Sequence, residues 1–303
     1  MPGLVPGIHV FLLQGIKRWM VGTSPGHDGN DRSPTLVESH LMDSLEIPAG
    51  SAAPALTSVI HSQPPRIWKF WGTALWGLFI FAAMFVGQIG VVAWFILRRG
   101  GPIDIAAAVH VVGGGLTISL SVIMGLPAVL AALWIAIRIS RTPFADYLAL
   151  RWPSWTDLAI GIVAMIVLVM GWELLTRAAG REIGPGFMGE VLNSARADGS
   201  LWLLVIAFVI AAPISEEFFA RGFLYHGWSE SFLGPVGAIV LSSLVWTALH
   251  LQYDWFILGE VFSIGLLLGS LRYRFNSTWL TVIVHGLNNL AVVIQIMLIA
   301  GQS

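Results

Sequence analysis

The sequence predicts an all-α fold, a polytopic transmembrane helix bundle of about seven spans, with eight as the alternative. Hydrophobic residues make up 56% of the 303 residues, charged residues make up only 11%, and the mean hydropathy is +0.79. A soluble globule of this length needs more polar side chains to cover its surface. From Arg66 onward, apolar runs recur that reach the roughly 20 helical residues needed to cross a bilayer.

These apolar runs give the order of the predicted spans. A break hidden in the long first run, or in a connection, would add an eighth. The longest polar connection contains GFMGEVLNSARA, which we expect to form a short amphipathic helix on the membrane surface. The seven predicted spans cover residues 70–97, 113–137, 157–175, 201–224, 236–252, 255–272 and 278–300.

The first part of the chain differs in composition from the rest. It contains Gly, Ser, Pro and scattered charges, as in TSPGHDGNDRSP, and has no sustained apolar period. Such a segment cannot bury enough apolar surface to offset the entropy of ordering. We therefore expect a disordered N-terminal arm at residues 1–65 and one transmembrane domain at residues 66–303.

Charge and residue usage limit the partners. A net charge of -1 without a basic stripe argues against nucleic acid, and the absence of cysteine excludes disulfides, thiolate metal ligands and a cysteine nucleophile. We expect the protein to be embedded in the lipid bilayer of a bacterial inner (plasma) membrane. Basic residues favour a cytoplasmic N-terminus, because one side of the bundle would collect Arg66, Lys69, Arg138, Arg141, Arg151, Arg272 and Arg274.

The fourth predicted span carries unexpected charge in the run PISEEFFARG. A charged side chain costs on the order of 2.5–3.5 kcal/mol at the centre of a membrane helix, which favours a functional use. Glu217 and Arg221 have the i, i+4 spacing of an ion pair along one helix face. Glu216 points about 100° away and is left free to react. A buried structural pair beside a protonated glutamate is an equally weighted alternative.

Two later spans carry polar pairs. Trp246 lies one turn before His250, and His285 lies one turn before Asn289, so each pair shares a face. A histidine and a carboxamide can donate hydrogen bonds to a single oxygen, as an oxyanion site requires. The alternative for each pair is a packing histidine or polar contact between helices, which is common in membrane bundles.

The sixth span, between them, contains two glycines at helical spacing. Gly265 and Gly269 form a small-xxx-small face that lets a neighbouring helix approach closely. We expect this contact to draw the polar faces of the fifth and seventh spans together.

In order and spacing, these motifs resemble the CAAX protease and bacteriocin-processing (abortive-infection-type) family of glutamate-dependent intramembrane proteases. The motifs are EExxxR from Glu216 to Arg221, an aromatic-xxx-His ending at His250, FxxGxxxG from Phe262 to Gly269, and HxxxN from His285 to Asn289. The resemblance covers about residues 140–300. The visible departure is Trp246 where the family often has Phe, which we expect to change the pocket size at most.

The resemblance implies proteolysis at or within the membrane, with residues 66–303 as the protease domain. The chemistry of the residues agrees: Glu216 would take a proton from water, and His250 would hold that water or pass the proton to the leaving amine. His285 and Asn289 would stabilise the oxyanion, while Glu217 and Arg221 would brace the site. We expect no metal or cofactor, and a membrane-associated protein or peptide as the substrate.

Two alternatives stay open. In the first, Glu216, His250 and His285 bind a catalytic zinc ion, since His2Glu is a known ligand set, although HExxH is absent. In the second, the chain is a proton-coupled transporter or a scaffold in which Glu216 and the histidines relay protons. Internal pseudosymmetry would favour a transporter, but no repeat is evident in the sequence.

Overall fold

The computed structural model describes residues 66–99, 112–181 and 186–300. These three ranges contain helices, turns and loops but no strand, which confirms the all-α prediction. The chain divides into two units, Met1–Ile60 and His61–Ser303, and every described residue belongs to the second. The predicted arm at residues 1–65 lies outside the described residues.

Six helices in the described part of the chain are long and apolar enough to cross a membrane, so the protein is an integral membrane protein. The predicted fifth span, at residues 236–252, is a shorter apolar helix at Gly234–His250. It consists of α10 (Gly234–Thr247) and a 3-10 turn, η3 (Ala248–His250). The six long helices are α1 (Lys69–Arg99), α3 (Gly115–Ser140), α5 (Trp155–Ala178), the continuous helix Leu201–Ser229, α11 (Trp255–Phe275) and α12 (Thr278–Ala300).

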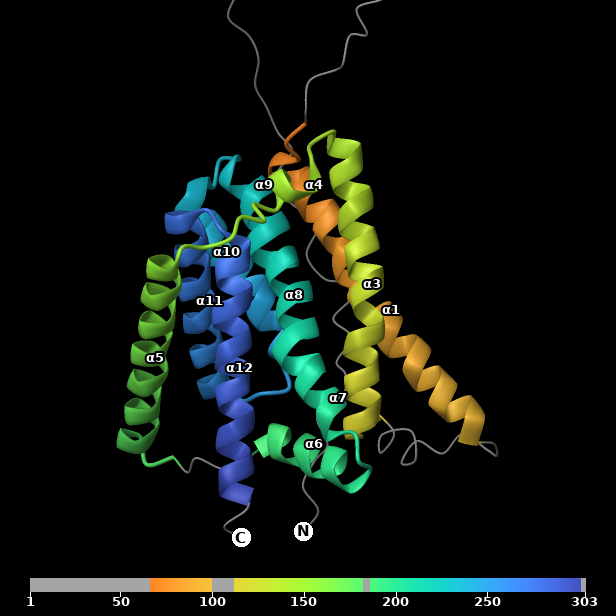
Figure 1. Cartoon of the computed structure of the whole chain (residues 1–303). Coiled ribbons are helices and arrows are strands. Elements are labelled where there is room, and N and C mark those ends of the chain that lie inside the picture. The colour runs from red at the N-terminus through yellow and green to blue at the C-terminus, as the bar shows by residue number, and fades with distance from the viewer. Residues whose placement is uncertain (1–65, 100–111, 182–185, 301–303) are drawn as a thin grey trace, which may run out of the picture. The chain divides into compact units, whose positions relative to one another are not determined.

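The predicted amphipathic segment is a helix, α6 (Gly186–Ala197), which confirms that prediction. It lies across one end of the bundle (Figure 1). Its buried side chains Val191 and Leu192 belong to a core cluster that also contains Leu204 and Ile296. The bundle therefore covers the apolar face of α6, and its location at the membrane surface stays a prediction.

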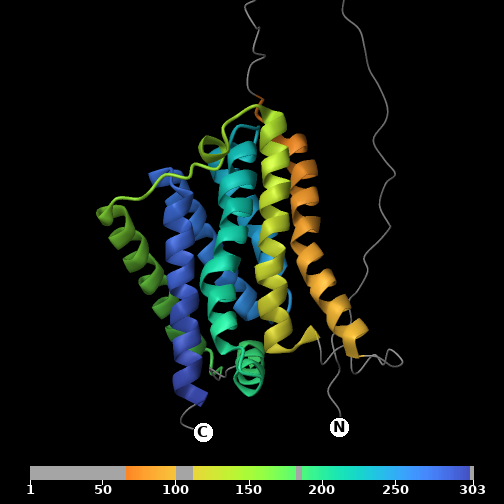
Figure 2. The same ribbon diagram turned by 45° about the vertical axis from the view of Figure 1, so that its right-hand side comes forward.

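The opposite end of the bundle is held together by backbone hydrogen bonds. The amide of Arg66 donates to Ser140 at the end of α3 (2.8 Å), and the amide of Thr278 at the start of α12 donates to Ala149 (3.0 Å). The segment between Ser140 and Ala149 contains the short helix α4 (Phe144–Tyr147). In both views α4 lies near the end of the bundle opposite α6 (Figures 1 and 2). The chain segments that carry the seven basic residues named above meet at this end, while its cytoplasmic orientation stays a prediction.

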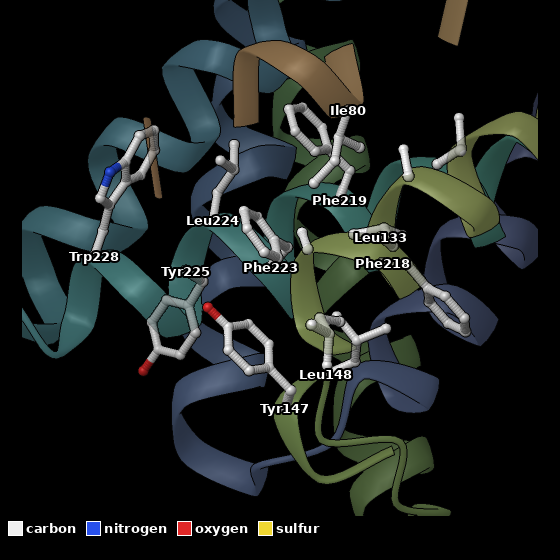
Figure 3. Close-up of a cluster of buried hydrophobic side chains, with 14 of the residues drawn as sticks. Ile80, Leu133, Tyr147, Leu148, Phe218, Phe219, Phe223, Leu224, Tyr225 and Trp228 are labelled. Atoms are coloured by element: carbon white, nitrogen blue, oxygen red, sulfur yellow. The ribbon is translucent and has the colours of Figure 1, made fainter. Parts of the chain in front are cut away.

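The largest core cluster fixes the helix that carries the acidic pair. Phe219 and Phe223, which follow Glu217, pack with Ile80 of α1, Leu133 of α3 and Tyr147 of α4 (Figure 3). The ring of Tyr147 stacks on that of Phe223 with centroids 5.5 Å apart. Burial raises the pKa of the Tyr147 hydroxyl. Side chains from three other helices thus hold the segment directly after Glu217.

Helices α1 and α3 cross at a pair of glycines, which gives a first prediction. A Cβ on Gly87 would lie 2.3 Å from the backbone nitrogen of Gly125. We expect Gly87→Ala to lower the free energy of unfolding by about 1–3 kcal/mol, because the helices would have to separate. The control is Gly90→Ala in the same helix, where a Cβ has no neighbour within 4 Å. Thermal unfolding in detergent measures both, and equal melting temperatures would contradict the close contact.

Candidate active site

The continuous helix Leu201–Ser229 is not a regular α-helix, which sequence reasoning did not predict. It runs through α7 (Leu201–Ile206), a π-helical stretch η1 (Ala207–Ala211), α8 (Ala212–Glu217), a second π-helical stretch η2 (Phe218–Leu224) and α9 (Tyr225–Ser229). Such stretches are rare and occur frequently at functional sites. The two glutamates lie between them, at the end of α8.

The first π-helical stretch leaves one carbonyl without a helical donor. The amide of Ala212 donates to Ala207 instead of Phe208, and Pro213, the next residue, has no N–H. The carbonyl of Phe208 accepts a hydrogen bond from Nδ2 of Asn289 in α12 instead (2.9 Å). Asn289 therefore satisfies a partly buried backbone acceptor and ties α12 to the glutamate helix.

Glu217 and Arg221 form the ion pair that their spacing predicts. Arg221 Nη1 lies 2.8 Å from Glu217 Oε1, and both side chains are 0% exposed. Two further contacts join this pair to other helices. His285 Nδ1 lies 2.9 Å from the same Glu217 oxygen, and Arg221 Nη2 donates to the carbonyl of Gly265 (3.1 Å). The pair thus links the glutamate helix to α11 and α12.

The hydrogen bonds of His285 and Asn289 go to different acceptors. Nδ1 of His285 pairs with Glu217, whereas Nδ2 of Asn289 reaches the Phe208 carbonyl. The sequence predicted that both side chains donate to one substrate oxygen. These contacts leave Nε2 of His285 and the second N–H of Asn289 for that purpose, so the oxyanion role stays a prediction.

Glu216 is half-buried and has a partner that the sequence did not predict. Nε1 of Trp246 in α10 donates to Glu216 Oε2 at 2.6 Å. The expectation that Trp in place of Phe changes only the pocket size is therefore wrong, because the indole also supplies a hydrogen-bond donor that phenylalanine lacks. The indole N–H is visible in the sequence, so the presence of Trp at this position could have indicated a hydrogen bond here.

His250 lies in the 3-10 turn after α10, beside Trp246. The carbonyl of Trp246 is 3.0 Å from Nδ1 of His250, and the two rings have centroids 4.8 Å apart. A carbonyl only accepts, so Nδ1 carries the proton and Nε2 is the nitrogen left for a proton transfer. Sequence reasoning missed Tyr253, whose ring stacks near that of His250 (6.3 Å); burial raises the pKa of its hydroxyl.

The glycines of α11 allow α10 to approach closely, as predicted. A Cβ on Gly265 would lie 2.9 Å from Ser243 Cβ, and one on Gly269 would lie 2.9 Å from Ile239 Cγ2. A third glycine was missed: a Cβ on Gly286 would lie 2.6 Å from the carbonyl oxygen of Val209. Close contact at Gly286 keeps its neighbour His285 within reach of Glu217.

A serine nucleophile and a bound metal ion are the two remaining candidate chemistries at this site. The hydroxyl of Ser215 donates to the carbonyl of Ala212 (2.9 Å), so this serine is engaged within its own helix. Within the described residues, no three His, Asp or Glu side chains form a group that could hold a metal ion. Elemental analysis of the purified protein would test the zinc alternative directly.

The chain matches known sequences over its C-terminal part. Residues 198–291 match the family model described as type II CAAX prenyl endopeptidase Rce1-like. UPF0177 protein YbdI of Lactococcus lactis subsp. lactis (strain IL1403) is 32% identical over 93 residues, which are 31% of this chain and 49% of that protein. An uncharacterized 24.3 kDa protein of Escherichia coli is 29% identical over 125 residues, 40% of this chain and 56% of that protein.

The chain spans about half the length of these curated relatives, at 49% and 56%. No solved structure matches significantly. The matched segment contains every candidate site residue, from Glu216 in the fourth predicted span to Asn289 in the last. Over residues 198–291 the chain is therefore similar to the Rce1-like type II CAAX prenyl endopeptidase family, which confirms the resemblance drawn from its motifs.

Proposed function

We propose that this protein is a glutamate-dependent intramembrane endopeptidase that hydrolyses a peptide bond of a membrane-associated protein or peptide. The observation that carries the proposal is the different environment of two adjacent glutamates. Glu217 is fully buried against Arg221 and His285, whereas Glu216 is half-buried. Among the described residues, no Lys or Arg forms an ion pair with Glu216. One carboxylate is thus neutralised, and the other is available as a base.

In this mechanism, Glu216 takes a proton from water, and the resulting hydroxide attacks the substrate carbonyl. Nε2 of His250 accepts a hydrogen bond from the water, then takes the proton from Glu216 and passes it to the leaving amine. Nε2 of a protonated His285 and the second N–H of Asn289 stabilise the oxyanion. Glu217 and Arg221 hold these groups in place without taking part in the chemistry.

The surroundings of the reaction are also part of the proposal. The protease domain comprises residues 66–303, embedded in a bacterial inner membrane with its N-terminal side in the cytoplasm. A membrane-embedded site favours a substrate that is itself in or on the bilayer. The family description names prenyl endopeptidases, and a lipidated protein is one substrate of this class.

The test compares protein termini in membranes from cells that carry wild-type protein or Glu216→Gln. We expect defined new N- and C-termini with the wild type only, because an amide cannot serve as the base; general-base catalysis typically contributes about 10²–10⁴-fold. The matched control is Glu190→Gln, an exposed glutamate of α6, which should give the wild-type pattern. Identical termini with and without Glu216 would refute the proposed mechanism.

A further inference from the structure

We propose that Trp246 is a positioning residue for Glu216: its indole N–H fixes the orientation of the carboxylate and stabilises the ionised form. The catalytic meaning of this inference rests on the proposed function, whereas the contact itself does not. Trp246 is 3% exposed and approaches from α10, a different helix from the one that carries Glu216.

The geometry of the contact suits a charged acceptor. Trp246 Nε1 lies 2.6 Å from Glu216 Oε2, and an indole nitrogen can only donate. Hydrogen bonds to ionised carboxylates are shorter and stronger than those to neutral groups. Among the described residues, this is the one hydrogen bond that the carboxylate of Glu216 makes, and it engages one of its two oxygens. The other oxygen, Oε1, is left to accept a proton from water.

The indole is itself held on several sides. The guanidinium of Arg221 lies over its ring at 4.6 Å, and the His285 ring stands against it at 87° with centroids 5.4 Å apart. A Cβ on Gly265 would lie 3.3 Å from Trp246 Cε3, so the glycine makes room for the ring edge. These contacts restrict rotation of the indole, and a fixed donor orients its acceptor.

Trp246 therefore joins the two glutamates through a chain of contacts. Glu217 pairs with Arg221, Arg221 lies over the indole, and the indole N–H donates to Glu216. A phenylalanine at this position would keep an aromatic face for the arginine but would lose the donor. Trp246→Phe consequently separates the hydrogen bond from the packing.

Other ionisable groups around Glu216 remain in that variant. They come from its own helix, from the end of α10, from the loop that follows and from α12, and they are Glu217, Arg221, His250, Tyr253 and His285. Since none of them is changed, a shift in the protonation of Glu216 reports the loss of the indole N–H.

The experiment measures that protonation directly. Dicyclohexylcarbodiimide reacts with protonated carboxyl groups in apolar surroundings, and mass spectrometry quantifies the labelled Glu216 in detergent-purified protein across a pH series. We expect the pH midpoint of labelling to rise by about 1–2 units in Trp246→Phe, the shift that corresponds to one lost hydrogen bond to a charged group. An unchanged midpoint would overturn the inference.

The matched control is Trp228→Phe. Trp228 is also buried, and its Nε1 donates to the carbonyl of Phe70 (3.2 Å), away from Glu216. This variant loses an indole hydrogen bond of the same kind, so it should keep the wild-type midpoint. An equal shift in both variants would mean that the labelling reports general loosening of the bundle, and it would also overturn the inference.

A second measurement decides the question if Trp246→Phe does not fold. In NMR spectra of wild-type protein carrying ¹⁵N-labelled tryptophan, one indole N–H signal should shift with pH. Its midpoint should equal the midpoint of carbodiimide labelling of Glu216, and the pH-dependent shift should be absent in Glu216→Gln. No indole signal that depends on Glu216 would overturn the inference. Neither measurement needs a substrate. A midpoint shift in Trp246→Phe, combined with no cleavage by the wild-type protein, would count against the proposed function alone. Cleavage by the wild-type protein, combined with an unchanged midpoint in Trp246→Phe, would count against the inference alone.

Discussion

Arg221→Ala is expected to destabilise the folded protein by about 3–5 kcal/mol and to abolish cleavage, because removing one partner of a buried ion pair leaves an uncompensated charge. Arg221 and Glu217 are both 0% exposed, and Arg221 also donates to the carbonyl of Gly265. The substitution would therefore leave a buried carboxylate without its cationic partner and a buried carbonyl without its side-chain donor. Thermal unfolding in detergent measures the loss.

Two comparisons make this result specific. Glu216→Gln should nearly keep the wild-type melting temperature, since Glu216 is half-buried and an amide can still accept the hydrogen bond from Trp246. Arg181→Ala removes an exposed ion pair with Asp254, whose side chains are 44% and 49% exposed, and should cost at most about 1 kcal/mol. If Glu216→Gln melts as low as Arg221→Ala, the proposed division between a bracing and a reacting glutamate is wrong.

His250→Ala is expected to reduce cleavage by about 10²–10⁴-fold, whereas exhaustive chelation of the wild-type protein should leave cleavage intact. Nδ1 of His250 is engaged by the Trp246 carbonyl, so the substitution removes Nε2 as the proton donor of the proposed mechanism. Metal independence is expected because the described residues bring no three candidate ligands together at one point. Cleavage of the substrate identified by its new termini measures both effects.

The controls separate a water mechanism from a zinc mechanism. His226→Ala, a change of the same kind in α9 where the ring packs against Tyr147, should keep cleavage. Stoichiometric zinc by elemental analysis, with activity lost on chelation and restored by zinc alone, would favour the alternative in which Glu216, His250 and His285 bind the metal. The proposed protease function would survive that outcome, but the proposed role of Glu216 as a base would not.

Most of the fold could be predicted because its signals are local. Apolar runs of spanning length gave the long helices, and the polar connection 176–200 contained the one segment that could form an amphipathic helix, now α6. The fifth span was predicted two residues too far along the chain, at 236–252 instead of Gly234–His250. Its last turn, η3, tightens into a 3-10 turn before the loop at Leu251, and no apolar pattern distinguishes such a turn from a continuing α-helix.

The site was predictable to a different degree. Spacing within one helix determined the Glu217–Arg221 ion pair, and the glycine motif of α11 determined the close approach of α10. The sequence also indicated which helices carry polar faces. It could not assign their partners, because a hydrogen bond between helices depends on relative rotation and depth, which spacing along one helix does not contain.

The sequence by itself therefore determined the class of the protein, the order of its helices and the residues on which the proposed chemistry depends. Only the tertiary structure decided that Trp246 donates to Glu216, that His285 pairs with Glu217 and that Asn289 donates to the Phe208 carbonyl. The last of these depends on a π-helical stretch and on Pro213, which together leave a backbone acceptor free. Helix propensity and hydrophobic period are properties of neighbouring residues, whereas these contacts exist only once three helices have packed at one rotation and depth.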